Sequence, residues 1–507
     1  MTLETVVGCA DGYLYAWRAD GSPVPGAWPV SLGAPIASSP AAGNITGDYH
    51  LEIVVGCDDG SLYALDHEGA VLWSFPIGGT LDATPALADV DDDGLMEIFI
   101  GGLEDGKGAK LYGIDGSGAD LPGGWPLKLG PGTIITSAAV GDVDDDGSFE
   151  IAVVTSGYDS PDYAHLHLFS EIGAAYGPSW PVTIDTTVVA PPVMGDVAGA
   201  GDDLEIVAGA LSGEVFAVAL DGSAVWPSPP RVPGRIERSP AMVGVPKSPY
   251  QRVAVSSRYW QYTMPPLGIW YTHVTLIDYA GTIASGWPNS AGYWSTDYGP
   301  VPGPIGIMEC LLAATQERDL FAWAQSDGDD MPAFPRHLDR RSLSTPAAGD
   351  IDGDGVLEIV IACSPDSVRC LELCSPDYPV DGTCWPMFRN DRTRCGCYVV
   401  EQVTGIENEP DDTVPAVTRL AAIYPNPFNP STNVRFDVHR RSAVRIALYD
   451  VNGRFVRLLV DRVMAPGSHT VAWDGRTAGG RRAASGVYFC RMRAGDVVQT
   501  RKMVLLR

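Results

Sequence analysis

A nine-residue acidic pattern recurs along the chain, and each time it leads into an apolar run. Its intact copies begin at Asp89, Asp142 and Asp350, and each has a carboxylate at positions 1, 3, 5 and 9 and a glycine at position 6. A tight loop with this spacing can bring alternate carboxylates and the position-7 carbonyl around Ca²⁺, a hard cation that takes six to eight oxygen ligands. The glycine permits the sharp bend. Because the following runs are β-rich, the pattern predicts calcium loops that feed strands in a repeated β architecture.

Two further copies of the pattern are imperfect. The copy at Asn44 keeps oxygen donors at all four positions, whereas the copy at Asp196 has alanines at two ligand positions and places Glu205 one residue late. An EF-hand would need a glutamate at position 12 and a helix on each side, but position 12 of the first intact loop is Ile100. Acidic surface turns without an ion are the alternative, and it has more weight for the Asn44 copy. The predicted calcium ligands are Asp89, Asp91, Asp93, Leu95 and Glu97; Asp142, Asp144, Asp146, Ser148 and Glu150; Asp350, Asp352, Asp354, Val356 and Glu358; and Asn44, Thr46, Asp48 and Glu52.

The acidic loops belong to a longer repeat. Each unit has a short strand, a loop, an apolar strand, a glycine-rich turn, a strand of the Leu-Tyr-Ala type, an Asp-Gly turn and, in most copies, Trp-Pro. The third strand recurs at spacings of 46 to 59 residues, with Leu14, Leu62, Leu111, Leu166, Val215, Val274, Leu320 and Val368 as its markers. A repeated four-stranded unit of this length is typical of a β-propeller blade. We therefore predict an all-β propeller over residues 1–400 with eight blades, or seven as the alternative, and expect the recurring Trp to pack between blades. The first unit lacks its inner strand, which residues 397–402 or an upstream segment would supply.

These loops and strands resemble FG-GAP/VCBS repeats, the family that includes the integrin α-subunit propellers. The run from Asp59 to Asp66 and the following Trp73 are also similar to repeats of pyrroloquinoline-quinone-type propellers. The resemblance covers about residues 1–395. It implies the fold and the Ca²⁺ ions, and it leaves the ligand open because one fold hosts many functions.

An aromatic insertion departs from the repeat. After Val253 the chain carries five aromatic residues between the second and third strands of its unit, and this unit and the next lack the acidic loop. Because the insertion joins strands two and three, we expect it on the opposite face of the disc from the loops. Exposed rings can stack on sugars or bury partner side chains, although a lid packed on its own blade explains them equally well. The candidate ligand-surface residues are Tyr259, Trp260, Tyr262, Trp270 and Tyr271.

The charge is asymmetric along the chain. Residues 415–507 contain 16 Lys and Arg against 5 Asp and Glu, and the remainder contains 18 against 58. The acidic body favours divalent cations over nucleic acid as a partner. No apolar run is long enough for a transmembrane segment. The N-terminus has no signal-peptide pattern. Its first residues resemble the strand that follows an acidic loop in the other units, and we therefore expect that the start of the chain is truncated.

The C-terminal part reads as a separate module. Residues 401–415 have the polar, acidic, Pro-bounded composition of a linker, and residues 416–507 contain short alternating strands with Asn-Gly and Asp-Gly turns, which favours a small β-sandwich. The runs 424–432, 449–454, 473–475, 485–489 and 500–504 closely resemble the Ig-like domain of the flagellar hook-capping protein and the related type IX secretion sorting domain. This resemblance implies export through secretion machinery to the surface or the medium.

Other candidate sites are weak. His165 and His167 share one strand face but have no third metal ligand nearby, so a packed pair is favoured. The six cysteines from Cys363 to Cys397 lack paired CxxC knuckles, and disulfides are favoured over zinc. The common hydrolase, metalloprotease, phosphate-loop and dinucleotide motifs are missing from the sequence. We therefore predict a secreted or bacterial cell-surface calcium-binding propeller that binds an extracellular protein or glycan. The competing hypotheses are a polysaccharide lyase or hydrolase on the same scaffold and, third, a quinoprotein.

Overall fold

A computed structural model describes residues 4–372 and 418–505. Within these ranges the description leaves out residues 19, 49, 80, 92, 105–107, 131, 158–162, 199–202, 245–249, 265–266, 294–298, 306–307, 332–333, 350, 352–357, 364–366, 425–431, 440–441, 451–453, 465–466, 474, 478–481, 484 and 495–496. The chain divides into two compact units, residues 1–400 and 401–507. All regular elements of the described residues are strands, so this part of the chain offers no helix that could cross a membrane.

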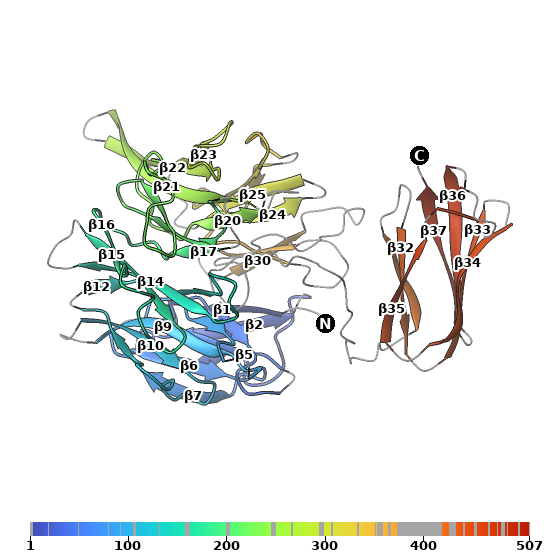
Figure 1. Ribbon diagram of the computed structural model, residues 1–507, viewed down its shortest axis with the longest axis horizontal. Helices are drawn as coiled ribbons and strands as arrows, with labels where there is room; N and C mark the ends of the chain where they lie inside the picture. Colours follow the sequence, from blue (N-terminus) through green and yellow to red (C-terminus); the bar gives the residue numbers. More distant parts are fainter. Residues whose placement is uncertain are drawn as a thin grey trace. The chain divides into compact units, whose positions relative to one another are not determined.

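Eight antiparallel sheets follow one another along the described residues of the first unit (Figure 1). The first three are β1 (Glu4–Gly8), β2 (Tyr13–Arg18) and β3 (Val30–Ser31); β4 (Ala41–Gly43), β5 (Glu52–Gly56), β6 (Ser61–Leu65) and β7 (Val71–Pro76); and β8 (Ala86–Ala88), β9 (Glu97–Glu104), β10 (Gly108–Ile114) and β11 (Leu127–Lys128). The fourth and fifth are β12 (Gly132–Ile135), β13 (Ala139–Gly141), β14 (Glu150–Gly157), β15 (Ala164–Ser170) and β16 (Val182–Ile184); and β17 (Val193–Gly195), β18 (Glu205–Gly209) and β19 (Val215–Val218). The last three are β20 (Ala241–Gly244), β21 (Gln251–Met264), β22 (Leu267–Ile277) and β23 (Asn289–Tyr293); β24 (Val301–Ile305), β25 (Met308–Ala314), β26 (Asp319–Ala324) and β27 (Arg336–His337); and β28 (Ala347–Gly349), β29 (Glu358–Cys363) and β30 (Ser367–Glu372).

The repeat predicted from the sequence matches these sheets one to one. Each of the eight markers from Leu14 to Val368 lies in the strand that follows the apolar strand of its sheet, from β2 to β30. The described residues therefore support eight units rather than seven. The first sheet has three strands, β1 to β3, as expected from its missing inner strand. Residues 397–402, which were expected to supply that strand, lie outside the described residues.

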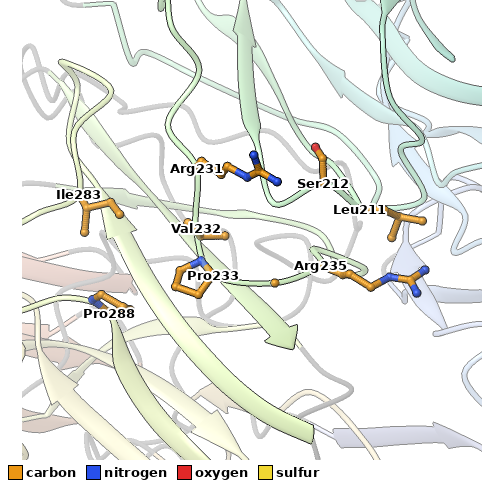
Figure 2. Close-up of a pocket in the computed structure, with 9 residues that line it drawn as sticks. Leu211, Ser212, Arg231, Val232, Pro233, Arg235, Ile283 and Pro288 are labelled. Atoms are coloured by element: carbon orange, nitrogen blue, oxygen red, sulfur yellow. The ribbon is translucent and has the colours of Figure 1, made fainter. Parts of the chain in front are cut away.

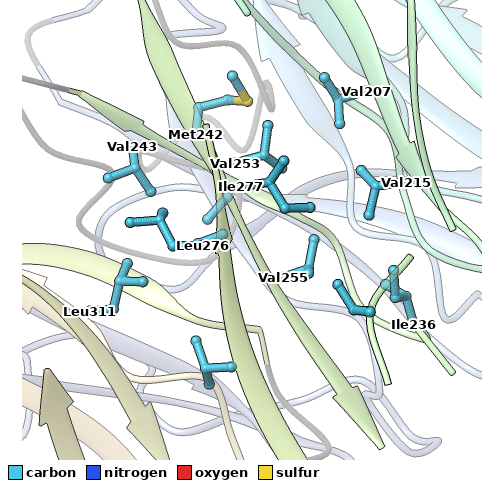
Figure 3. Packing of buried hydrophobic residues seen from close by; sticks show 14 of the residues in the cluster. Val207, Val215, Ile236, Met242, Val243, Val253, Val255, Leu276, Ile277 and Leu311 are labelled. Carbon is cyan, nitrogen blue, oxygen red and sulfur yellow. The ribbon is translucent and has the colours of Figure 1, made fainter. Parts of the chain in front are cut away.

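The first strands of neighbouring sheets lie side by side. Contacts run in order from β4 through β8, β13, β17 and β20 to β24. Apolar side chains fill the space between successive sheets, as Figure 3 shows for Val215, Val253 and Leu311, which come from β19, β21 and β25. Because both faces of each sheet are covered by neighbours, the central strands are buried almost without alternation, as in β5 and β18. This is how four-stranded sheets stack in a propeller.

A tryptophan near the end of a unit ties it to the following one. Five such indole Nε1–H groups donate to a backbone carbonyl in the turn after the strand that carries the marker residue of the next sheet. The pairs are Trp28 with His67 (3.1 Å), Trp73 with Gly116 (2.9 Å), Trp125 with Glu171 (3.2 Å), Trp180 with Leu220 (2.8 Å) and Trp226 with Tyr279 (3.1 Å). The predicted packing role of these residues between blades is confirmed.

The second unit is a small sandwich of two sheets. One is formed by β31 (Arg419–Tyr424), β32 (Thr432–Val438) and β35 (Gly467–Trp473), and the other by β34 (Phe455–Met464), β33 (Ser442–Asp450), β36 (Gly486–Ala494) and β37 (Val497–Leu505). Trp473 is fully buried between the sheets, and its Nε1–H donates to the Arg476 carbonyl at 2.8 Å. The short strands expected for this module are present, and they form the predicted small β-sandwich. The expected linker 401–415 lies outside the described residues.

Candidate metal sites and ligand surface

The acidic loops lead into the apolar strand of their sheets: the loop from Asp89 joins β8 to β9, and the loop from Asp142 joins β13 to β14. In the third sheet, one ligand oxygen from each of Asp89, Asp91 and Glu97 lies within 4.8 Å of the others. In the fourth sheet the same holds for the carboxylates of Asp142, Asp144 and Asp146. The sequence pattern thus brings together positions 1, 3 and 9 in one loop and positions 1, 3 and 5 in the other. Asp93 and Glu150 belong to these two loops but lie outside the respective groups.

The first carboxylate also shapes its loop. Asp142 accepts hydrogen bonds from the N–H groups of Asp146 (3.1 Å) and Gly147 (2.9 Å), one to each oxygen. Asp89 accepts equivalent bonds at 3.1 and 2.9 Å. Gly147 has a φ of 88°, in the left-handed region that glycine adopts without strain, which explains the glycine at position 6. The predicted ligands Leu95 and Ser148 follow these glycines, and their N–H groups donate to Asp93 and Asp146.

The glutamate at position 9 has a second role that the sequence pattern did not reveal. It is the first residue of the second strand, and in five sheets its Oε2 accepts a hydrogen bond from the backbone N–H at the start of the loop. The five are Glu52, Glu97, Glu150, Glu205 and Glu358, which are between 1% and 8% exposed, with donor distances of 2.8 to 3.1 Å from Ile45, Val90, Val143, Val197 and Ile351. Because Glu205 makes the same bond in the broken copy, the glutamate holds the loop whether or not the other ligands are present.

The donor set fits a hard cation. Asp144 presents one oxygen, Oδ1, that is buried and has no hydrogen-bond partner, while its Oδ2 accepts from the Tyr176 hydroxyl at 2.7 Å. A buried carboxylate oxygen without a partner is costly unless a ligand supplies the missing charge. Oxygen-only donors at this spacing are those that Ca²⁺ prefers over softer metals. Asp142, Asp144 and Asp146 would hold the ion, together with backbone carbonyls of the loop.

The loop glutamates are protonated more readily than ordinary carboxylates. Burial raises the pKa of Glu97 to about 7, and the charges of Asp91, Asp93 and Asp89 act in the same direction, whereas the Val90 N–H opposes them. Burial likewise raises the pKa of Glu150 to about 7. A bound divalent cation would reverse this balance by stabilising the ionised carboxylate.

The description covers different parts of the other two predicted loops. In the Asn44 copy, Asn44 accepts from the Gly47 N–H at 2.8 Å and Glu52 accepts from Thr46 at 3.2 Å, while Asp48 accepts from the His50 N–H at 2.6 Å. Asp350, Asp352, Asp354 and Val356 lie outside the described residues. Glu358 is buried and bonded like its counterparts.

The aromatic insertion is a continuous hairpin. Strands β21 and β22 pair from Val253 and Ile277 outward to Met264 and Leu267, and Figure 1 shows them extending together from their sheet. Tyr259 and Tyr271 are stacked, with centroids 5.5 Å apart, and Tyr259 also stacks on His273 at 5.2 Å. Trp260 and Trp270 meet edge to face at 5.3 Å, and Trp260 remains 40% exposed. Tyr262 lies in β21, but its side chain is outside the described part.

The aromatic hairpin and the acidic loops leave their sheets at opposite ends of the strands. The acidic loops join first and second strands, whereas the hairpin joins the second and third strands of its sheet. In an antiparallel meander these two connections leave at opposite ends of the strands, so the hairpin and the loops lie on opposite faces of the first unit.

The histidine pair is packed rather than arranged around a metal. His167 is buried and its Nε2 lies 2.9 Å from the Thr155 hydroxyl, while His165 Nδ1 lies 3.3 Å from the Thr183 hydroxyl. Burial, with a contribution from His165, lowers the pKa of His167 to about 4. Of the cysteine cluster, Cys363 is a buried thiol without a disulfide. Residues Cys374, Cys384, Cys395 and Cys397 lie outside the described residues.

Two features were missed by the sequence patterns. Gln251 begins β21 opposite Gly244, the place that Glu97 takes opposite Ala88, so an uncharged residue replaces the buried glutamate in the sheet that lacks the acidic loop. The second feature is an open hollow of about 590 Å³ beside the hairpin, lined in part by Arg231 and Arg235. The equivalence of Gln251 and Glu97 becomes visible only from the strand register. The hollow could not be found from local patterns, because it is lined by segments that are distant in the sequence.

Comparisons with known proteins agree with this two-part description. A search against curated proteins finds no match. The quinohemoprotein alcohol dehydrogenase from Comamonas testosteroni superposes with a TM-score of 0.50 at 13% identity, covering 71% of this chain and 68% of that one. BamB from Moraxella catarrhalis gives a TM-score of 0.47 at 13% identity, covering 72% of this chain and 92% of BamB. Sqt1 from Saccharomyces cerevisiae gives 0.49 at 12% identity, with coverage of 74% and 94%.

At these identities the similarity shows the fold alone, and the fold of the first unit is that of a β-propeller. Residues 428–496 match the family model of the FlgD Ig-like domain. The chain is therefore an all-β protein that combines a propeller with a C-terminal FlgD-type Ig-like domain.

Proposed function

We propose that this protein is an exported, calcium-stabilised β-propeller that acts as a binding module at the bacterial cell surface or in the medium. Its ligand is an extracellular protein or glycan held on the face that carries the β21–β22 hairpin. The C-terminal Ig-like domain serves as the secretion or anchoring signal and contacts the secretion machinery. FG-GAP/VCBS-type repeats and a type IX sorting role are part of this proposal.

The observation that carries the calcium part is the group formed by Asp142, Asp144 and Asp146. Three carboxylates gather in one loop, and the buried Oδ1 of Asp144 has no hydrogen-bond partner. A cation at this point would offset the repulsion among the carboxylates and add its binding free energy to the stability of the folded state. The group around Asp89 supports a second site of the same kind.

The binding surface rests on the hairpin. A packed lid would bury its aromatic side chains, whereas Trp260 presents 40% of its surface to solvent beside Trp270. Large aromatic rings that remain exposed on a rigid strand are favourable anchors for a ligand, because little conformational entropy is lost when they bind. The sheet that carries the hairpin is well packed, with Val253, Val255 and Val274 in one buried apolar cluster.

Calorimetric titration of the EDTA-treated full chain with Ca²⁺, followed by Mg²⁺, tests the calcium part. We expect two to four sites that prefer Ca²⁺, from the loops beginning at Asn44, Asp89, Asp142 and Asp350. Asp144→Asn should remove one of them, and Asp185→Asn, which changes an acidic residue outside the loops, should remove none. Equal binding of both ions with no loss in Asp144→Asn would show that the acidic turns are ordinary surface.

A further inference from the structure

A segment rich in positive charge leads into the hairpin. Residues 1–230 contain four Lys and Arg, namely Arg18, Lys107, Lys110 and Lys128. Residues 231–258 alone contain six, namely Arg231, Arg235, Arg238, Lys247, Arg252 and Arg258, and one acidic residue, Glu237. In a unit that is otherwise strongly acidic, this segment offers an anion a favourable local field.

The fold brings two of these arginines against the hairpin. Arg235 and Arg258 form a backbone bridge, with N–H to carbonyl distances of 2.8 and 3.0 Å in the two directions. Glu237 pairs with both side chains, at 2.6 Å to Arg258 and 3.4 Å to Arg235, which fixes the two guanidinium groups in position. Arg258 also lies over the ring of Trp270, 5.1 Å from its centroid, and thereby links the charged segment to the aromatic pair.

The hollow beside this segment has both charged and apolar walls. Its volume is about 590 Å³, and it is lined by Ser212, Arg231, Arg235, Ile283 and Pro288 among others. In Figure 2 the Arg231 side chain extends from its loop towards Ser212, while Ile283 and Pro288 lie on the other side of Pro233. Arg231 is exposed and makes no ion pair with any described residue. A pocket of this size accommodates a small oligosaccharide or a ligand of similar bulk.

We propose that the hollow and the hairpin together bind an acidic oligosaccharide whose sugar rings carry carboxylates, as in a polyuronate. The carboxylates would pair with Arg231 and Arg235, since a guanidinium matches a carboxylate in a two-point hydrogen-bonded geometry. The apolar wall and the exposed ring of Trp260 would cover the C–H faces of the sugars. This inference rests on the proposed function and deepens it, because it names the chemical class of the ligand.

The acidic remainder of the unit does not prevent such binding. Fields of exposed charges are largely screened beyond about 8 Å at physiological ionic strength, so a short ligand in the hollow is governed by the arginines around it. A long polyanion would extend over acidic surface and be repelled. The site therefore selects short acidic segments or the ends of chains over extended nucleic acid.

Binding of trigalacturonate to the calcium-loaded full chain tests the proposal, with the carboxyl-reduced, neutral trisaccharide as the matched ligand. We expect trigalacturonate to bind at least about tenfold more tightly than the neutral sugar, with an advantage that shrinks as salt is added. Arg231→Ala should weaken its binding about tenfold and Arg231→Lys less, because lysine keeps the charge but loses the planar fork. Lys128→Ala, which removes a positive charge from another exposed strand, should change nothing. Trp260→Ala should weaken the binding of both sugars.

Several outcomes would overturn the acidic-ligand proposal. Equal binding of the two sugars that Trp260→Ala abolishes and Arg231→Ala leaves intact would refute it and leave the proposed glycan-binding function standing. Tighter binding of oligo-dT than of trigalacturonate would reassign the site to nucleic acid. Binding of neither sugar by chains whose melting temperature is normal would also refute it, while the calcium titration reports separately on the rest of the proposed function.

Discussion

The third and sixth sheets of the propeller have the same four-stranded topology and differ in almost everything that the fold does not require. In the third sheet an acidic loop precedes the buried Glu97, and its closing Trp125 donates to a carbonyl of the next sheet. In the sixth sheet Gln251 stands at the glutamate's place, and the Nε1–H of the closing Trp287 is buried without a partner. The second and third strands of the sixth sheet continue into the aromatic hairpin.

The comparison separates the features that the propeller fold requires from those that are specific to one sheet. Both sheets keep a fully buried apolar residue on the third strand, Leu111 in one and Val274 in the other, and both keep a buried closing tryptophan. The acidic loop is dispensable, since the sixth sheet packs without one. The sixth sheet carries the aromatic hairpin instead, next to the arginines of residues 231–258. The candidate ion sites and the candidate ligand surface are thus distributed over different sheets and different faces.

Removal of calcium should produce the largest effect. If the loops at Asp89 and Asp142 each bind Ca²⁺ at about 100 times its dissociation constant, each contributes about 2.7 kcal/mol, and chelation should lower the melting temperature by roughly 5–10 °C. Differential scanning calorimetry with EDTA, and then with excess Ca²⁺, measures this change. Hydrogen exchange should locate the loss of protection in the third and fourth sheets and leave the sixth unchanged. Uniform loss over all sheets would contradict the distinction between them.

The pH dependence of the metal-free protein should have an unusual sign. Glu97, Glu150 and Glu205 have folded-state pKa values raised to about 7 from an ordinary value of 4.5. Between these values the folded state holds protons that the unfolded chain has released, so stability should fall as the pH rises from about 4.5 to 7. We expect the melting temperature to fall over this window, and calorimetry at a series of pH values measures the change.

Calcium distinguishes the intact loops from the broken one in this experiment. Ca²⁺ should remove the part of the fall that Glu97 and Glu150 cause, since the ion keeps them ionised, and it should leave the part from Glu205. Glu205→Gln should then flatten the remaining dependence, because glutamine still accepts the Val197 and Ala198 bonds without titrating. A calcium-loaded protein whose melting temperature falls over this window as steeply as that of the metal-free protein would argue against ion binding at these loops.

The two closing tryptophans offer a matched pair of substitutions. Trp125→Phe and Trp287→Phe remove similar volumes from buried sites, but the first also removes a hydrogen bond to Glu171. Trp125→Phe should therefore be the more destabilising by about 1 kcal/mol. Urea unfolding of both variants gives the comparison. Equal losses would mean that the indole hydrogen bond contributes nothing beyond the packing of the ring.

The smallest effect on stability is expected for a substitution on the aromatic hairpin of the sixth sheet. Trp260→Ser removes a ring that is 40% exposed, so the free energy of unfolding should change by about 0.5 kcal/mol or less. Urea unfolding measures the free energy of unfolding of this variant, and the loss in Trp125→Phe serves as the reference for a buried tryptophan. A loss as large as that of Trp125→Phe would mean that the Trp260–Trp270 pair supports the sheet instead of serving a ligand.

The sequence by itself determined the architecture. The marker residues from Leu14 to Val368 predicted eight sheets in the right places, because a strand buried by neighbours on both faces needs an apolar side chain at a constant point of the repeat. The acidic loops were located for a similar reason, since a turn that gathers three carboxylates needs its glycine and its spacing. The C-terminal strands followed from their alternation and their turns.

Tertiary structure decided the roles that depend on register and on distant partners. The hydrogen bond from the start of the loop to the position-9 glutamate forms only when the loop folds back on its own strand. That Gln251 takes the position of Glu97 in another sheet is visible only when the two sheets are aligned by their strand pairing. The hollow depends on segments that meet because the propeller places one sheet's turn beside the next sheet's entry, with Arg235 bridged to Arg258. Local patterns encode local geometry, whereas the candidate ligand site is made from three separate stretches of chain that only folding brings together.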